Sequence, residues 1–186
     1  EMTFMKIAGI QKNSFVDYPG KVAAVIFTRG CNMNCYFCHN RHLLTECEGE
    51  QYDDSEILSF LNDRKKFLDA VVISGGEPTL QPGLAEFIRK IKALGFLVKL
   101  DTNGTRPGIL KELIDEGIID YAAMDIKAPF ERYEEICGTP VDIERIQESI
   151  NLLMQGRIEY EFRTTVVPEL TEEDIIKISG RIKGAR

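Results

Sequence analysis

Short apolar segments alternate with amphipathic segments along this chain, and that alternation constrains its fold more than any other feature. Five apolar runs are partly β-branched and nearly continuous, which is typical of strands buried on both faces of a parallel sheet. They cover residues 21–28, 68–74, 95–102, 118–127 and 160–167. Segments with helical spacing of apolar residues follow at 53–68, 83–94, 107–117, 142–156 and 171–182. Repeated strand–helix units predict an α/β fold, with the sheet either open or curled into a barrel.

Composition narrows the classes of function. The length of 186 residues suits one domain over residues 1–186. The formal net charge of −7 disfavours nonspecific nucleic-acid binding. No apolar run approaches the length of a membrane span, and the N-terminus lacks a signal-peptide pattern, so we expect a cytoplasmic protein that does not act in a membrane. Clustered cysteines in the reducing cytosol serve metal binding or catalysis rather than disulfides.

Chemically distinctive residues follow the predicted strands, at the point where each strand ends. The carboxyl ends of parallel strands meet at one edge of a sheet, and α/β proteins place their sites there. The segments are RGCNMNCYFCHN (29–40), SGGEP (74–78), DTNG (101–104), MDIKAP (124–129) and VVPE (166–169). This coincidence predicts a single active site.

The loop at residues 29–40 holds three of the five cysteines. Cys31, Cys35 and Cys38 are spaced C-x3-C-x2-C, so one loop could supply three thiolates to one metal centre. Thiolates are the usual ligands of iron–sulfur clusters, and three of them leave one iron of a 4Fe–4S cluster without a protein ligand. An open metal position is what chemistry at a metal requires.

A zinc site is the alternative for these thiols. Structural zinc takes four ligands, usually from two paired knuckles. Cys47 and Cys137 do not form a second knuckle, and we expect both to be plain thiols. A zinc site would therefore need His39 or His42 as its fourth ligand, and the chain would then be a non-catalytic zinc-binding module.

With Phe37 before its last cysteine, the three-cysteine motif resembles that of the radical S-adenosylmethionine superfamily. The likeness runs from about Gly9 to about Pro168. The segment SFVDYPGKVAAVIFTRGCNMNCYFCHN (14–40) resembles the opening of glycyl-radical-enzyme activases. Among these it is most similar to the activating proteins of anaerobic ribonucleoside-triphosphate reductase, with the pyruvate formate-lyase activating enzymes as near relatives.

The resemblance implies a fold and a reaction. The fold is a partial (β/α)6 barrel, and because only five strands are recognisable, we expect the sixth to be missing or truncated. The cofactors are a 4Fe–4S cluster and S-adenosylmethionine. The open iron chelates S-adenosylmethionine, and one electron from a donor such as flavodoxin or ferredoxin cleaves it. The resulting 5′-deoxyadenosyl radical takes a hydrogen atom from a glycine of a partner enzyme, so no catalytic residue is assigned beyond the cluster.

The resemblance also implies residues that bind S-adenosylmethionine. Backbone groups of Gly75 and Gly76 meet its ammonium group, and the backbone at Phe37 meets its adenine. Glu77 either accepts a hydrogen bond from the ammonium or braces the turn. From the residues alone, the SGGEP segment favours an ordinary strand-to-helix turn, since paired glycines permit unusual backbone angles.

A monovalent cation beside the cofactor carboxylate is a further implication. By position, its ligands would be Asp101, Thr102, Asp125 and the carbonyl of Ala123, and oxygen ligands suit a hard cation. Lys127 would then face the cofactor or the substrate. The simpler alternative pairs Asp125 with Lys127, because residues two apart on a strand point the same way.

Three further residues are candidates for the site. His39 and Asn40 directly follow Cys38, and we expect them to position the cofactor or the target loop. Arg163 lies in the fifth predicted strand, where it either faces the site or pairs with a nearby carboxylate. A radical enzyme with a small-molecule substrate remains the alternative to a protein activase.

Overall fold

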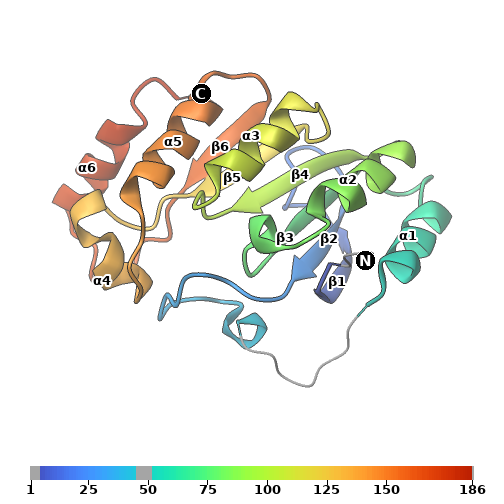
Figure 1. The fold of residues 1–186 in the computed structure, drawn as a ribbon, viewed down its shortest axis with the longest axis horizontal. Helices are drawn as coiled ribbons and strands as arrows, with labels where there is room; N and C mark the ends of the chain where they lie inside the picture. Colours follow the sequence, from blue (N-terminus) through green and yellow to red (C-terminus); the bar gives the residue numbers. More distant parts are fainter. Residues whose placement is uncertain (1–4, 45–51, 186) are drawn as a thin grey trace.

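One six-stranded sheet forms the frame of the computed structural model, which describes residues 5–44 and 52–185 (Figure 1). The strands lie in the sheet in chain order. They are β1 (Ile7–Ser14), β2 (Ala23–Thr28), β3 (Ala70–Gly75), β4 (Leu97–Thr102), β5 (Tyr121–Asp125) and β6 (Glu159–Arg163). Strands β2 to β6 are parallel, so the five predicted strands and the α/β class are confirmed.

Strand β1 was not predicted. It pairs antiparallel with β2, with Ile10 opposite Ile26. Most of its residues are exposed or only partly buried, because β1 lies at the edge of the sheet. The polar second half of β1, QKNS (11–14), therefore lacks the continuous apolar run by which the buried strands were recognised. Strand β1 is therefore an additional antiparallel strand and not the expected sixth strand of the barrel. The described residues hold five parallel strands in an unclosed sheet.

Helices cover one face of the sheet, where their apolar sides join the main core (Figure 1). The five predicted helices are confirmed with shorter bounds, and one short helix, α4, was not predicted. They are α1 (Asp54–Asp63), α2 (Leu84–Ala93), α3 (Pro107–Asp115), α4 (Tyr133–Cys137), α5 (Ile143–Met154) and α6 (Glu172–Arg181). Among the residues that the structure describes, no helix combines the length and apolar character of a membrane span.

Local sequence explains where the helices begin and end. Helix α1 starts with a capping box, in which the side chain of Asp53 accepts from backbone N–H groups and Glu56 bonds back to the N–H of Asp53. It ends at Arg64, whose carbonyl accepts from the N–H groups of Phe67 and Leu68. This turn exposes Phe67 and buries Leu68, which is why the helix is shorter than its apolar pattern predicts.

The other face of the sheet carries small apolar residues on β2 and β3 and charged residues on β4 to β6. Lys99 on β4 is almost fully buried on this face, with 2% of its side chain exposed. Its Nζ donates to the carbonyl of Asp17 at 2.6 Å and to Glu161 at 3.1 Å, and lies 3.8 Å from Asp101. A buried ammonium therefore ties β4 to β6 and to the loop between β1 and β2.

Replacing Lys99 with methionine is expected to destabilise the protein by about 3 kcal/mol, because the substitution leaves buried acceptors without their cation. Urea unfolding of the apo protein measures this effect. Lys90→Met is the matched control, since Lys90 forms an exposed pair with Glu86 four residues earlier on α2. Equal stability of the two variants would show that the buried ammonium contributes nothing.

Candidate active site

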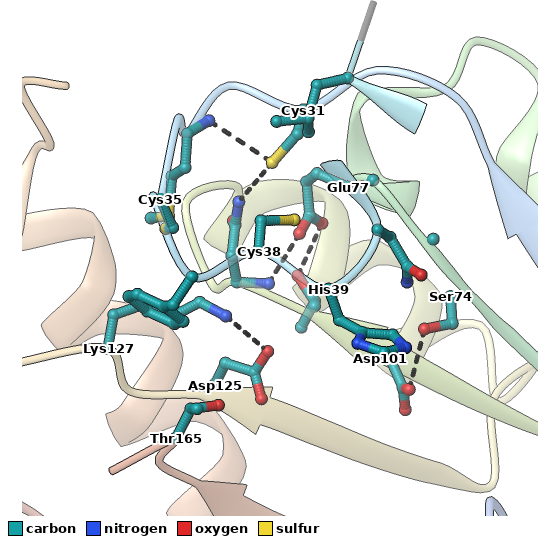
Figure 2. Close-up of a pocket in the computed structure, with 18 of the residues that line it drawn as sticks. Cys31, Cys35, Cys38, His39, Ser74, Glu77, Asp101, Asp125, Lys127 and Thr165 are labelled. Atoms are coloured by element: carbon teal, nitrogen blue, oxygen red, sulfur yellow. Dashed lines mark hydrogen bonds and ion pairs between the residues drawn. The ribbon is translucent and has the colours of Figure 1, made fainter. Parts of the chain in front are cut away.

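A cavity of about 420 Å³ opens at the carboxyl ends of the parallel strands. Its walls come from the loop at residues 29–40, here called the cluster loop, and from the ends of β3, β4, β5 and β6 with the residues that follow them (Figure 2). All the predicted site residues line it except Ala123, which is buried within β5. The lining residues among them are Cys31, Cys35, Phe37, Cys38, His39, Asn40, Gly75, Gly76, Glu77, Asp101, Thr102, Asp125, Lys127 and Arg163. Segments far apart in the sequence thus meet at one place.

The loop at 29–40 places Cys31, Cys35 and Cys38 along one side of the cavity (Figure 2). All three are free thiols. Neighbouring backbone holds the loop, as the N–H of Asn34 donates to the carbonyl of Cys137 at 2.9 Å. The guanidinium of Arg41 adds a bond to the carbonyl of Cys35 at 3.1 Å. The loop that carries the thiols is therefore anchored on α4 and by its own C-terminal flank.

The thiols differ in their surroundings. Burial raises the pKa of Cys31 to about 11. The pKa of Cys35 is lowered to about 7, chiefly by a hydrogen bond from Cys137, with the charge of Lys127 contributing. The same contact and burial raise the pKa of Cys137, which is fully buried. The lowered pKa favours the thiolate form of Cys35, which is the form that binds iron.

The zinc alternative depends on His39 or His42 as a fourth ligand. In residues 5–44 and 52–185, no group of three or more His, Cys, Asp and Glu side chains surrounds a single metal-ion position. His39 is exposed at the cavity wall, beside the partly buried Asn40. Cys47 lies outside the described residues. Three cysteines on one loop facing one cavity fit the larger iron–sulfur cubane in number and chemistry.

Gly75 and Gly76 pack directly on the backbone at the start of the cluster loop. Gly75 has a φ of +114°, and a Cβ there would lie 2.3 Å from the N atom of Thr28. A Cβ on Gly76 would lie 2.0 Å from the carbonyl oxygen of Gly30. The N–H of Gly76 donates to Thr28 at 2.9 Å, and that of Glu77 donates to Gly30 at 2.8 Å. Both amides are therefore occupied, and a cofactor ammonium, which can only donate, would need carbonyl acceptors here.

Glu77 braces this turn. Its carboxylate is 1% exposed and accepts from the N–H and hydroxyl of Thr79, from the hydroxyl of Thr102 at 2.7 Å and from the N–H of Asn103 at 2.7 Å. Burial raises the pKa of Glu77, and these hydrogen bonds oppose the rise. Because its buried carboxylate already accepts four hydrogen bonds from the protein, the geometry favours bracing over direct contact with an ammonium.

Glu77→Gln is expected to destabilise the apo protein by about 1–3 kcal/mol, since the new amide turns a donor toward the N–H of Asn103. Thermal unfolding without any cofactor measures this. A residue that only contacted the cofactor would leave the apo protein unchanged, so an unaltered melting temperature would contradict the bracing role.

Acidic and basic side chains alternate across the opposite wall. Arg163 lies 3.1 Å from Asp125 and 3.4 Å from Asp101, and Lys127 lies 2.8 Å from Asp125. Ser74 donates to Asp101 at 3.0 Å, and burial raises the pKa of Asp101. Lys127 and Arg163 thus both face the cavity and also pair with carboxylates. The sequence offers these two arrangements as alternatives, and the structure shows both at once.

Asp101, Asp125 and Thr102, three of the predicted cation ligands, each contact another side chain, although one oxygen of Asp101 accepts no hydrogen bond in the described part of the chain. Arg163 bridges the carboxylates of Asp101 and Asp125, and the hydroxyl of Thr102 donates to Glu77. The Oδ1 atom of Asp101 is buried and has no hydrogen-bond donor among the described residues. The guanidinium therefore takes the place between the two carboxylates that the cation prediction uses, and the cation stays a prediction.

Five lining residues were not predicted as site residues: Met33, Leu44, Ser74, Asn103 and Thr165. Ser74 and Asn103 lie within the SGGEP and DTNG segments, where their position beside predicted ligands was the available signal. Asn103 reads as a turn residue in sequence because Asn-Gly is a common turn pair. Met33 and Leu44 carry no chemical signal and contribute apolar wall.

A family described as the Radical SAM superfamily matches residues 25–182. A Methanocaldococcus jannaschii protein described as a candidate glycyl-radical enzyme activating enzyme is 42% identical, over 95% of this chain and 75% of its own length. The pyruvate formate-lyase-activating enzyme of Clostridium pasteurianum is 28% identical, over 100% of this chain and 79% of its own length.

Solved structures share the fold. Streptococcus suis SuiB bound to S-adenosylmethionine has a TM-score of 0.67 and 18% identity, covering 84% of this chain and 36% of SuiB. TYW1 with a lysine–pyruvate adduct has a TM-score of 0.61 and 20% identity, covering 86% of this chain and 60% of TYW1. At these identities the similarity concerns the sheet and helices alone.

Proposed function

Because the chain belongs to the radical S-adenosylmethionine superfamily, we propose that it activates a glycyl radical enzyme by creating a glycyl radical on that partner. Members of this superfamily use a 4Fe–4S cluster and S-adenosylmethionine. The observation that carries the proposal is the convergence of the three-cysteine loop, the glycine turn and the Asp101–Arg163–Asp125–Lys127 wall on one cavity. The relatives named as activating enzymes support the choice of a protein substrate.

Separate groups of residues in this chain would hold the cluster and the cofactor. Cys31, Cys35 and Cys38 would hold three irons and leave the fourth open to S-adenosylmethionine. When bound, the cluster and this cofactor supply a carbon-centred radical that removes a hydrogen atom from glycine. Carbonyl groups at Gly75 and Gly76 would accept hydrogen bonds from the cofactor ammonium, because an ammonium group can only donate.

The charged wall and the cluster loop would orient the rest of the cofactor. Lys127 and Arg163 face the cavity with cationic groups that attract a carboxylate. Backbone at Phe37, on the cluster loop, would meet the adenine. A closed pocket keeps water and other reactants from a radical, and a partner loop inserted into the cavity would provide that closure.

The partner that the N-terminal motifs support is an anaerobic ribonucleoside-triphosphate reductase. The segment SFVDYPGKVAAVIFTRGCNMNCYFCHN (14–40) supports this branch over the pyruvate formate-lyase branch. A flavodoxin or ferredoxin in the cytoplasm would deliver the electron. A small-molecule substrate is the second candidate.

Electron paramagnetic resonance tests the proposed function. The reconstituted, reduced protein is mixed anaerobically with S-adenosylmethionine and the reductase, or with pyruvate formate-lyase in a parallel sample. We expect a glycine-centred doublet in the reductase sample, and none with a reductase whose radical glycine is replaced by alanine. A doublet only on the lyase would correct the partner, and no protein radical on either enzyme would contradict the proposal.

A further inference from the structure

Asn103 connects the two halves of the site. It lies directly after β4, is 6% exposed and lines the cavity. Its backbone N–H donates to Glu77 at 2.7 Å, which ties it to the turn at Gly75–Gly76. Its side-chain amide reaches the cluster loop, where it donates to Asn32 at 2.9 Å and to the sulfur of Cys31 at 3.8 Å.

The orientation of this amide is fixed by its neighbours. The N–H of Thr105 donates to the Oδ1 atom of Asn103 at 3.1 Å, and the hydroxyl of Thr105 lies 2.7 Å from the same oxygen. A backbone N–H can only donate, so the oxygen of Asn103 must face Thr105 and its NH₂ group must face the loop. One proton of that NH₂ then serves Asn32 and the other serves Cys31.

The sulfur of Cys31 thus accepts from two N–H groups, which Figure 2 draws as two dashed lines meeting at that sulfur. One comes from Asn103, and the other is the backbone N–H of Met33 at 3.4 Å. The bond from Met33 lies within the cluster loop itself. Of these two bonds, the one from Asn103 links the sulfur to the end of β4, the strand that carries Asp101 and Thr102.

We propose that Asn103 is a positioning residue that holds Cys31 in place and raises the reduction potential of the cluster. Reduction adds negative charge that is shared with the ligand sulfurs, and a hydrogen bond to a sulfur stabilises that charge. The backbone bond to Glu77 makes the same residue sensitive to the turn that would bind S-adenosylmethionine. The inference rests on the proposed function, because it requires the cluster to bind at Cys31.

Three variants test this role. Asn103→Ala removes both side-chain donors but keeps the backbone bond to Glu77. Asn103→Asp keeps the shape and the acceptor for Thr105 while it removes the donors, so a role in packing alone would survive it. Asn32→Ala is the matched control, since it disturbs the same network without removing a bond to sulfur.

The measurements are bound iron after anaerobic reconstitution, the melting temperature of each apo protein, and the midpoint potential of the cluster by redox titration. We expect both Asn103 variants to have a more negative midpoint potential than the wild type, with the larger shift in Asn103→Asp. Asn32→Ala should keep the wild-type potential. Loss of iron from the Asn103 variants with an unchanged apo melting temperature would equally support their hold on Cys31.

Opposite results overturn the inference. Unchanged potentials in both Asn103 variants would do so, as would an equal shift in Asn32→Ala. Apo proteins of both Asn103 variants that no longer fold would assign the residue to structure alone. A wild-type protein that binds no cluster would instead sink the proposed function, so the two failures are distinguishable.

Discussion

Alanine in place of Cys31, Cys35 or Cys38 is expected to abolish stable binding of the iron–sulfur cluster. Each thiol lines the cavity from the same short loop, and a cubane that already lacks one protein ligand cannot lose a second without becoming labile. The measurement is iron and sulfide per protein after anaerobic reconstitution, together with the visible absorption of the cluster. We expect all three variants to lose most of their bound iron.

Cys137→Ala is the control for this experiment. Cys137 is a buried thiol beside Cys35, on α4 rather than on the cluster loop. We expect this variant to retain its iron, although the contact with Cys35 is lost. Normal iron content in any of the three loop variants, or its loss in Cys137→Ala alone, would contradict the ligand assignment.

Gly76→Ala is expected to destabilise the protein by about 3 kcal/mol or more and to lower its iron content. The new Cβ would lie 2.0 Å from the carbonyl oxygen of Gly30, so backbone must move, and overpacking of this kind is costly. Gly30 begins the cluster loop, and the displaced loop would carry Cys31 with it. Chemical unfolding of the apo protein and iron content of the reconstituted protein measure the two effects.

Gly108→Ala is the matched control, because a Cβ at Gly108 on α3 meets nothing within 4 Å. This change should leave the iron content unaltered and add up to about 1 kcal/mol of stability, as alanine favours a helix over glycine. A Gly76→Ala variant that is as stable and binds as much iron as Gly108→Ala would show that the turn accommodates a Cβ, which would contradict the predicted clash with Gly30.

The sequence predicts the part of the fold that burial dictates. Strands β2 to β5 are recognisable because they are largely buried on both faces, which demands continuous apolar runs. Strand β6 lies at the other edge of the sheet and is only partly buried, and it is recognisable from an apolar run that extends past its end to Val167. Edge strand β1 escapes prediction since its exposed residues need no such pattern. Helix α4 is too short to show helical periodicity in the sequence. Its last residue, Cys137, nevertheless anchors the cluster loop, because its carbonyl accepts a hydrogen bond from the N–H of Asn34.

Site residues could be predicted as a group because the carboxyl ends of parallel strands converge. Their individual roles could not, since these depend on contacts between distant segments. Gly76 touches Gly30, Glu77 accepts from Thr102, and Arg163 bridges two carboxylates, and none of these pairs is adjacent in sequence. Ala123 lies within β5 and does not line the cavity, and its carbonyl stays a predicted cation ligand that no contact in the structure tests.

The central claim is that the radical generated in this cavity is delivered to a glycine of a protein partner. The most direct measurement counts 5′-deoxyadenosine by chromatography and glycyl radical by spin quantification in the same anaerobic sample. The account predicts slow cleavage of S-adenosylmethionine by the reduced protein alone, and equal amounts of the two products once the cognate glycyl radical enzyme is added. Fast cleavage without any protein partner, accelerated further by a small metabolite, would contradict it.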